Sequence, residues 1–277
     1  MAERTIPAAS SLLPVLFDEQ KCIDFLFAET ILLTPESCYA CGGRISRNGQ
    51  IFRCTRNSCR KATSIFRSSF FSKGRLRCCE VLHLGYLWLT GCSRQIILHN
   101  VTHSKDTVSA YLAWFRELVS QMLEPDDTMV GGPNVIVEMD ETKFGRRKYH
   151  RGHRVDGAWV IVSVKRTVDC LVFAEVVPNR SAETIDDVLS RHIVDGSILH
   201  TDFWKGYASI SERFNIEHRT VNHSKGFKDP ATGVHTNTVE GTNYALKRSV
   251  PPRSRTRSSL PLHLIEFVWR RKHSANL

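Results

Sequence analysis

Hydrophobic positions follow a helical rhythm in the middle of the chain. Between residues 78 and 123 apolar side chains recur every three or four positions, the period of amphipathic helices. This pattern predicts a helix ending at Gly91, a short helix over residues 93–101 and a longer helix over residues 105–123. A helix-turn-helix, whose last helix enters the major groove of DNA, has this layout, and so has a plain three-helix packing unit. In the first case Ser104, Lys105 and Thr107 face DNA.

The second half of the chain has the pattern of strands with helices between them. Runs rich in β-branched residues, bounded by turn residues, predict strands over residues 134–140, 158–164, 171–177, 197–201 and 216–222. Helical periodicity predicts helices over residues 181–192, with Ser181 as N-cap, and 204–214. This α/β order resembles the ribonuclease-H fold, in which the first and fourth strands lie side by side. The ends of these strands carry Asp140 and Asp202.

Breaks in the pattern predict the domain organisation. Residues 1–33 predict a helical segment, with one helix over residues 18–27, and the polar stretch 124–133, which contains Gly and Pro, predicts an interdomain linker. The full plan is a helical segment (1–33), a zinc ribbon (34–77), a helix-turn-helix region (78–123), the linker (124–133) and a ribonuclease-H-like domain (134–277).

The prediction of a zinc ribbon rests on four cysteines: Cys38, Cys41, Cys54 and Cys59. Thiolates paired at short spacing on two turns hold a tetrahedral Zn²⁺, and a hairpin around Asn48-Gly49 fits between the pairs. The second pair is separated by four residues rather than two, and the alternative is four small core residues without a metal. The other five of the nine cysteines have no such spacing, and we interpret them as buried thiols.

Composition narrows the class of partner. The 277 residues include 38 Lys and Arg against 28 Asp and Glu, a formal net charge of +10. Such a balance indicates an anionic partner, first nucleic acid and second an acidic membrane surface. No apolar run approaches the roughly 20 residues that span a bilayer, and the first residues lack the pattern of a signal peptide. We therefore expect an intracellular protein that does not bind a membrane. In a reducing compartment, nine cysteines favour metal binding over disulfides.

The acidic residues give candidate chemistry. Glu138 and Asp140 share one face of the first predicted strand, while Glu141 points to the other. Carboxylates crowded at a strand end suit a hard divalent cation, although a strand can also simply end in solvated charge. Glu240 and Lys247 lie about two helical turns apart on one helix face, where the acid binds metal and the lysine contacts a phosphate. Alternatively, Glu240 closes a capping box with Asn237.

Taken together, the motifs resemble the DDE transposases of the Merlin type, which are related to bacterial insertion-sequence transposases. The acids are separated by 61 residues (202 − 140 − 1) and 37 residues (240 − 202 − 1). The segments that carry the resemblance are MDETKFGRRKYHRGH, TDFWKGY, VNHSKGF, TGVHTNTVEGTNYALKR and LHLIEFVWRRK. Relatives also carry a cysteine ribbon and a helix-turn-helix in front, so the resemblance covers nearly the whole chain.

This resemblance implies a DNA transposase that cuts and joins DNA at transposon ends. Two Mg²⁺ or Mn²⁺ ions are then held by Asp140, Asp202 and Glu240, and a structural Zn²⁺ sits in the ribbon. Some relatives place an Asn near the third acid, which makes Asn237 an alternative ligand. The implied partners are terminal-repeat and target DNA and further copies of the chain, and the implied location in a eukaryote is the nucleus. The rival hypothesis is a domesticated relative that only binds DNA.

Several further side chains are candidates for DNA contact. A basic run follows the first acid and is expected to track the phosphate backbone, unless it is only a solvated face: Lys143, Arg146, Arg147, Lys148 and Arg151. Trp204, Lys205 and Tyr207 are placed to brace a terminal base, or Trp204 packs the start of a helix. Of the histidines near the site, His235 is the one we expect to touch substrate.

Overall fold

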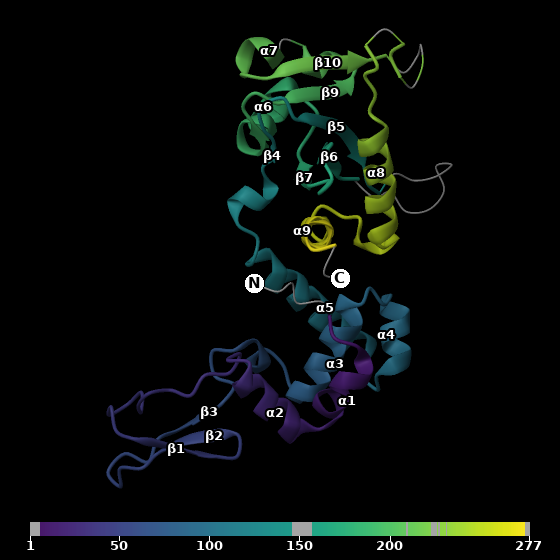
Figure 1. Ribbon diagram of the computed structural model, residues 1–277. Helices are drawn as coiled ribbons and strands as arrows, with labels where there is room; N and C mark the ends of the chain where they lie inside the picture. Colours follow the sequence, from purple (N-terminus) through teal and green to yellow (C-terminus); the bar gives the residue numbers. More distant parts are fainter. Residues whose placement is uncertain are drawn as a thin grey trace. The chain divides into compact units, whose positions relative to one another are not determined.

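A computed structural model describes residues 6–145, 157–208, 210–222, 226, 228–230 and 232–274 (Figure 1). The chain divides into two compact units, Met1–Leu112 and Ala113–Leu277, and the division lies inside helix α5 (Lys105–Ser120). None of the helices in these ranges is both long enough and apolar enough for a bilayer crossing.

The first unit combines a small antiparallel sheet with helices. Its elements are α1 (Ala9–Phe17), α2 (Glu19–Ala28), β1 (Ile45–Asn48), β2 (Ile51–Cys54), β3 (Ala62–Ser64), η1 (Phe70–Ser72), α3 (Cys78–Leu89) and α4 (Arg94–Asn100), followed by the start of α5. The predicted hairpin is confirmed, because β1 pairs with β2 across a turn in which Gly49 has a φ of 59°. Two elements were not expected: β3, which pairs with β2, and α1, whose interior contains the helix breaker Pro14.

Helices α3, α4 and α5 occupy the three ranges that the hydrophobic period predicted. Ser93 caps α4 by accepting the backbone N–H of Ile96 at 3.3 Å, and Ser104 accepts that of Thr107 at 3.1 Å at the start of α5. Arg94 ties the two helices together, since its Nε donates to the Ser109 hydroxyl at 2.9 Å. A buried cluster that includes Ile23 and Leu26 of α2, Phe52 of β2 and Cys78 of α3 joins the sheet to these helices.

The second unit is built on a five-stranded mixed sheet. Its elements are η2 (Pro125–Thr128), β4 (Val130–Gly131), β5 (Ile136–Lys143), β6 (Trp159–Lys165), β7 (Val172–Val177), α6 (Ala182–His192), β8 (Ile193–Val194), β9 (Ile198–Asp202), η4 (Lys205–Tyr207), α7 (Ile210–Arg213), β10 (Glu217–Val221), α8 (Asn237–Ser249), η5 (Pro252–Ser254) and α9 (Leu260–Lys272). The strand order is β10-β9-β5-β6-β7. Strand β5 pairs antiparallel with β6 and parallel with β9, so the first and fourth predicted strands are neighbours, as expected.

Helices cover both faces of this sheet (Figure 1). Side chains alternate between faces along a strand. Met139 of β5 and Ile161 of β6 therefore pack with α6, whereas Val160 and Val162 of β6 pack with α8 and α9. The result is a three-layer α/β/α unit that buries its strands on both sides.

Two segments differ from the predictions. The helix expected over residues 204–214 is replaced by η4 and the short α7. The Trp204 ring folds onto Gly206, where a Cβ would lie 1.9 Å from the ring, and this packing breaks the helical path. Residues 124–133, expected as a linker, contain η2 and β4, and Val130 of β4 pairs with Ile193 of β8 inside the second unit.

Candidate active site and cysteine cluster

The first two acids are brought together by the register of two parallel strands. Three pairs of residues match between β5 and β9, from Ile136 with Ile198 to Glu138 with His200, and every pair is 62 positions apart. Asp140 and Asp202 have the same offset and lie two residues further along, on the same face. The two carboxyl groups therefore emerge just beyond the point where β5 and β9 stop pairing. The prediction that the first strand ends at Asp140 is wrong, because β5 continues to Lys143 paired with β6, whereas β9 does end at Asp202.

The surroundings of Asp140 are crowded with negative charge. Burial, and next the charge of Asp202, raise the pKa of Asp140 to about 6, and Glu240 adds to this rise. The backbone N–H of Glu141 and the side-chain amide of Asn243 act in the opposite direction. A carboxylate in such a position gains stability from any cation that binds beside it.

Helix α8 supplies the third acid on a stripe that faces Asp140. Glu240, Asn243 and Lys247 are spaced by three and four residues, so they lie on one side of the helix. The amide Nδ2 of Asn243 donates to Oδ2 of Asp140 at 2.7 Å. Burial lowers the pKa of Lys247, while the charge of Asp140 opposes this shift. Asn243 was not among the residues selected from the sequence, although its spacing from Glu240 was visible there.

The start of α8 is held by a buried carboxylate from β5. Glu138 has no exposed surface. Its Oε2 accepts the backbone N–H groups of Thr238 and Val239 at 2.8 and 2.9 Å, and its Oε1 accepts the Thr238 hydroxyl at 2.9 Å. Arg166 Nε lies 3.4 Å from Oε1, and His235 Nδ1 lies 3.5 Å from it. Negative charge at a helix N-terminus is favourable, so Glu138 docks α8 onto the sheet.

The contacts at the start of α8 show whether Asn237 and Glu240 cap this helix. The N-cap of α8 is Thr236, and the side chain of Glu240 accepts the Thr236 hydroxyl at 3.2 Å. Asn237 is exposed in the first turn. Because Glu138 takes the free N–H groups of Thr238 and Val239, the capping box predicted between Asn237 and Glu240 is not what closes this helix.

Glu141 lies on the opposite face, as predicted from the strand period. Burial, and next the charge of Asp140, raise its pKa to about 8. The Tyr207 hydroxyl donates a hydrogen bond to its Oε1, and Arg180 Nη1 lies 4.0 Å from its Oε2. Arg180 also stacks over the rings of Trp159 and Trp204, at 4.3 and 4.9 Å from their centroids.

These contacts remove Tyr207 from the set of base-stacking candidates, since it is 1% exposed and packs in the core. Trp204 packs against the same core cluster, as the alternative interpretation predicts. The exposed aromatic ring beside Asp202 is instead Phe203, at 72%.

The other predicted contact residues are dispersed. Lys143 is exposed, and its ammonium group lies 5.2 Å from the centroid of Trp159. Lys205 is exposed on η4, and His235 faces Glu138. Arg146, Arg147, Lys148 and Arg151 lie outside the described residues.

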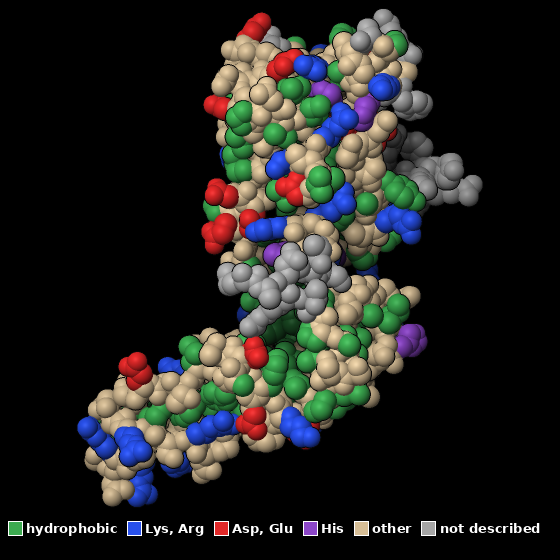
Figure 2. Space-filling model, in the orientation of Figure 1, with side chains coloured by type: hydrophobic (Ala, Val, Ile, Leu, Met, Phe, Trp, Pro, Cys, Tyr) green, Lys and Arg blue, Asp and Glu red, His purple; other side chains and the backbone are tan. Residues whose placement is uncertain are grey.

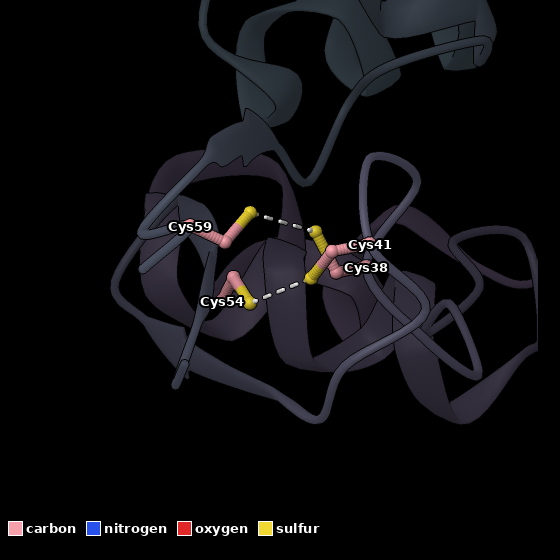
Figure 3. A group of neighbouring side chains, drawn as sticks. All are labelled: Cys38, Cys41, Cys54 and Cys59. Carbon is pink, nitrogen blue, oxygen red and sulfur yellow. Dashed lines mark hydrogen bonds between the residues drawn. The ribbon is translucent and has the colours of Figure 1, made fainter. Parts of the chain in front are cut away.

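The four predicted cysteines form a compact cluster (Figure 3). Sγ of Cys38 lies 3.8 Å from that of Cys59, and Sγ of Cys41 lies 3.6 Å from that of Cys54. All four sulfur atoms lie within 4.8 Å of one another, and no other set of three or more His, Cys, Asp or Glu in the described part of the chain does so. Thiolates about 2.3 Å from a tetrahedral Zn²⁺ are separated by about 3.8 Å. The backbone N–H of Ala40 is the main cause that lowers the pKa of Cys38 to about 7.

Comparison with protein families identifies the chain. A model of the ISXO2-like transposase domain matches residues 119–271, more than half of the 277 residues. The chain belongs to the ISXO2-like transposase family. The resemblance to DDE transposases is thereby confirmed at the level of the family. The matched segment of this ISXO2-like chain includes Asp140, Asp202, Glu240 and Lys247 but none of the four clustered cysteines.

Two other comparisons add little to this ISXO2-like assignment. No curated protein matches the chain. Among solved structures, a pre-cleavage Mos1 transpososome matches 72% of this chain and 79% of its own chain, with 11% identity and a TM-score of 0.22. At that TM-score the match carries no argument about this chain.

The role of Glu138 in this ISXO2-like domain gives a first prediction. We expect Glu138→Ala to lower the free energy of unfolding by about 3 kcal/mol, because it leaves Arg166 and the first N–H groups of α8 without their buried partner. Glu138→Gln keeps an accepting oxygen and loses less. Urea unfolding followed by circular dichroism measures both.

Glu217→Ala is the matched control. Glu217 is an exposed acid on the edge strand β10 and pairs with Arg219 at 2.7 Å. Exposed pairs contribute less than about 1 kcal/mol, so this variant stays close to the unchanged protein. Equal stability of the Glu138→Ala and Glu217→Ala variants would contradict the docking role.

Proposed function

We propose that the chain is a DNA transposase that transfers phosphodiester bonds with divalent metal ions. The observation that carries the proposal is the convergence of Asp140, Asp202 and Glu240, with Lys247, inside the segment that matches the transposase family. Two of the acids stand on adjacent parallel strands and the third on a helix docked over them.

The sheet supports a ribonuclease-H-like assignment of the second unit. The first three strands are antiparallel and consecutive, and the fourth and fifth run parallel to the first on its other side. In this layout the first and fourth strands carry the acids side by side: Asp202 is the last residue of β9, and Asp140 lies inside β5, two residues beyond its last pair with β9. Helix α8 follows the fifth strand and brings Glu240 to them.

The residues fit a pair of Mg²⁺ or Mn²⁺ ions. Carboxylate oxygens are the preferred ligands of these hard cations. Asp140, Asp202 and Glu240 would divide between two ions, so the site would not require all three acids within 4.8 Å of one another. Asp140 is the central acid, because both Asp202 and Glu240 act on its pKa. Bound ions supply activation of the attacking water or 3′-hydroxyl and stabilise the leaving oxygen.

Lys247 is suited to hold the scissile phosphate beside these acids. Its ammonium group is partly buried and close to Asp140. An in-line attack forms a new oxygen–phosphorus bond while the bond to the leaving oxygen breaks, and a fixed cation stabilises the negative charge on the phosphate.

The first unit is suited to bind DNA. Between Ser37 and Cys79 the sequence has ten Lys or Arg and no Asp or Glu, a number equal to the whole formal net charge of +10. All ten members of this cationic ribbon surface are exposed: Arg44, Arg47, Arg53, Arg56, Arg60, Lys61, Arg67, Lys73, Arg75 and Arg77. Figure 2 shows Lys and Arg side chains gathered where β1 and β2 lie in Figure 1. We infer that a Zn²⁺ in the cysteine cluster holds this surface in shape and that α3–α5 act as a helix-turn-helix.

The alternative function is DNA binding without catalysis, as in a domesticated transposase. The cationic ribbon surface fits this function equally well, whereas the clustered acids Asp140, Asp202 and Glu240 do not need to be kept for it. The proposal includes terminal-repeat and target DNA as partners, assembly of several copies on DNA, and action in the nucleus if the host cell has one.

Cleavage separates the two functions. We expect the purified protein to nick DNA carrying the transposon ends when Mn²⁺ or Mg²⁺ is added. Asp140→Asn removes the central acid and is expected to reduce cleavage at least 100-fold, with DNA affinity unchanged in a gel-shift measurement. Tight binding of the correct ends without any metal-dependent nicking would favour the alternative.

Elemental analysis tests the zinc site. We expect one Zn²⁺ per chain in reduced protein, because four sulfur atoms are already at tetrahedral spacing. Cys38→Ser is expected to lose the metal, while Cys170→Ser, outside the cluster, is expected to keep it. Metal-free, folded protein would contradict the ribbon assignment.

Salt dependence tests the cationic ribbon surface. Each phosphate contact contributes about 0.9 to the slope of log K against log salt. Replacing Arg44 and Arg53 together by Ala is expected to reduce this slope by about 2 for any DNA sequence. The double Lys variant keeps both charges and keeps the slope, so an unchanged slope in the Ala variant would remove these two residues from the DNA-binding surface.

A further inference from the structure

Asn243 carries a buried polar atom whose role the fold does not explain. The side chain is 6% exposed. Its Nδ2 donates to Asp140, whereas its Oδ1 has no hydrogen-bond partner among the described residues. An unpaired buried oxygen costs about 1–3 kcal/mol, so a folded protein keeps one where something else uses it.

The orientation of this amide follows from charge. The N–H side must face the Asp140 carboxylate, because the opposite orientation would set two oxygen atoms against each other. The bonds from the amide carbon to O and N are about 1.2 and 1.3 Å, so Oδ1 lies within about 5 Å of Asp140 Oδ2. The unpaired oxygen is therefore part of the acidic site.

The backbone groups near the start of α8 that Oδ1 of Asn243 could serve already have other partners. The first N–H groups of α8 are taken by Glu138. The next turn is closed by the Thr242 hydroxyl, which donates to the carbonyl oxygen of Thr238 at 2.8 Å. An apolar side chain of similar size at position 243 would pack in the same space without an unpaired oxygen.

We propose that the amide oxygen of Asn243 binds the divalent cation held by Asp140. This inference rests on the proposed function and extends its ligand set. Neutral amide oxygens and carboxylates together suit Mg²⁺ and Mn²⁺. One side chain then performs two tasks, since Nδ2 orients Asp140 and Oδ1 contacts the ion. The amide beside the acids is Asn243 and not Asn237, which is exposed in the first turn of α8.

The test is Mn²⁺ affinity, measured on the full, zinc-loaded chain without DNA by the electron paramagnetic resonance signal of free Mn²⁺. Asn243→Ala removes both the oxygen and the donor, and we expect affinity to fall about tenfold or more. Asn243→Asp loses the donor but keeps an oxygen in the same place, and at pH 8 we expect affinity equal to or above that of the unchanged protein. Asn237→Ala is the matched control and leaves affinity unchanged.

The Asp variant distinguishes a ligand from a purely positioning residue. If Asn243 acts only by holding Asp140 through Nδ2, Asn243→Asp loses affinity as Asn243→Ala does, and the proposal is overturned. Unchanged affinity in Asn243→Ala overturns it as well. Circular dichroism without Mn²⁺ confirms that each variant is folded.

Failure of the broader proposal has a different signature. An unchanged protein that binds no Mn²⁺ and cuts no DNA would contradict the proposed transposase activity itself. If the wild-type protein binds Mn²⁺, but with the same affinity as the Asn243→Ala variant, only the role of Asn243 is contradicted.

Discussion

The geometry of the candidate active site depends on the bond between Glu138 and the N-terminus of α8. Asp140 and Asp202 are fixed by strand register, but Glu240, Asn243 and Lys247 reach them only if α8 starts at the right place on the sheet. A buried carboxylate that accepts two backbone N–H groups sets this start within the length of a hydrogen bond. The helix dipole and Arg166 offset the free-energy cost of burying the charge of Glu138. Glu138 therefore positions α8, and with it Glu240, without being one of the candidate metal-binding acids.

In the first unit, too, a distant carboxylate bonds the N-terminus of a helix. Helix α3 begins at Cys78, and the residue before it, Arg77, has no side-chain oxygen to cap it. The carboxylate of Glu19, on α2, accepts the backbone N–H groups of Cys78 and Cys79 at 3.2 and 3.1 Å. In α3 the local Glu80 accepts the backbone N–H of Arg77 at 2.9 Å, and Glu19 accepts the next two. In both units an acid far away in the sequence thus bonds the first N–H groups of a helix and thereby fixes one element against another.

These long-range caps also show how far the sequence could predict the structure. Period-two alternation correctly placed Glu138 and Asp140 on one face, and the strand order correctly made β5 and β9 neighbours. The sequence could not say that Glu138 serves a helix about 100 residues later, because local pattern carries no information on which N-terminus arrives there. The same limit explains why the sequence could not show that Trp204 and Tyr207, which resemble DNA contacts, pack into the core.

The distribution of charge separates the surface proposed to bind DNA from the acids proposed to cut it. Outside residues 37–79 the chain has 28 Lys and Arg, since 38 − 10 = 28, against 28 Asp and Glu, so it is formally neutral. The second unit alone, residues 113–277, has 24 Lys and Arg against 20 Asp and Glu, a formal net charge of +4. The clustered acids of the candidate site would still repel a phosphate placed beside them, because repulsion is screened only beyond about 8 Å at physiological salt. In the proposed transposase, attraction to DNA would come first from the cationic ribbon surface, which contains no acid, and neutralisation at the site from Lys247 and the cations that the acids would hold. Under the proposed function, binding and cutting would depend on separate groups of charges, so the loss of one need not abolish the other.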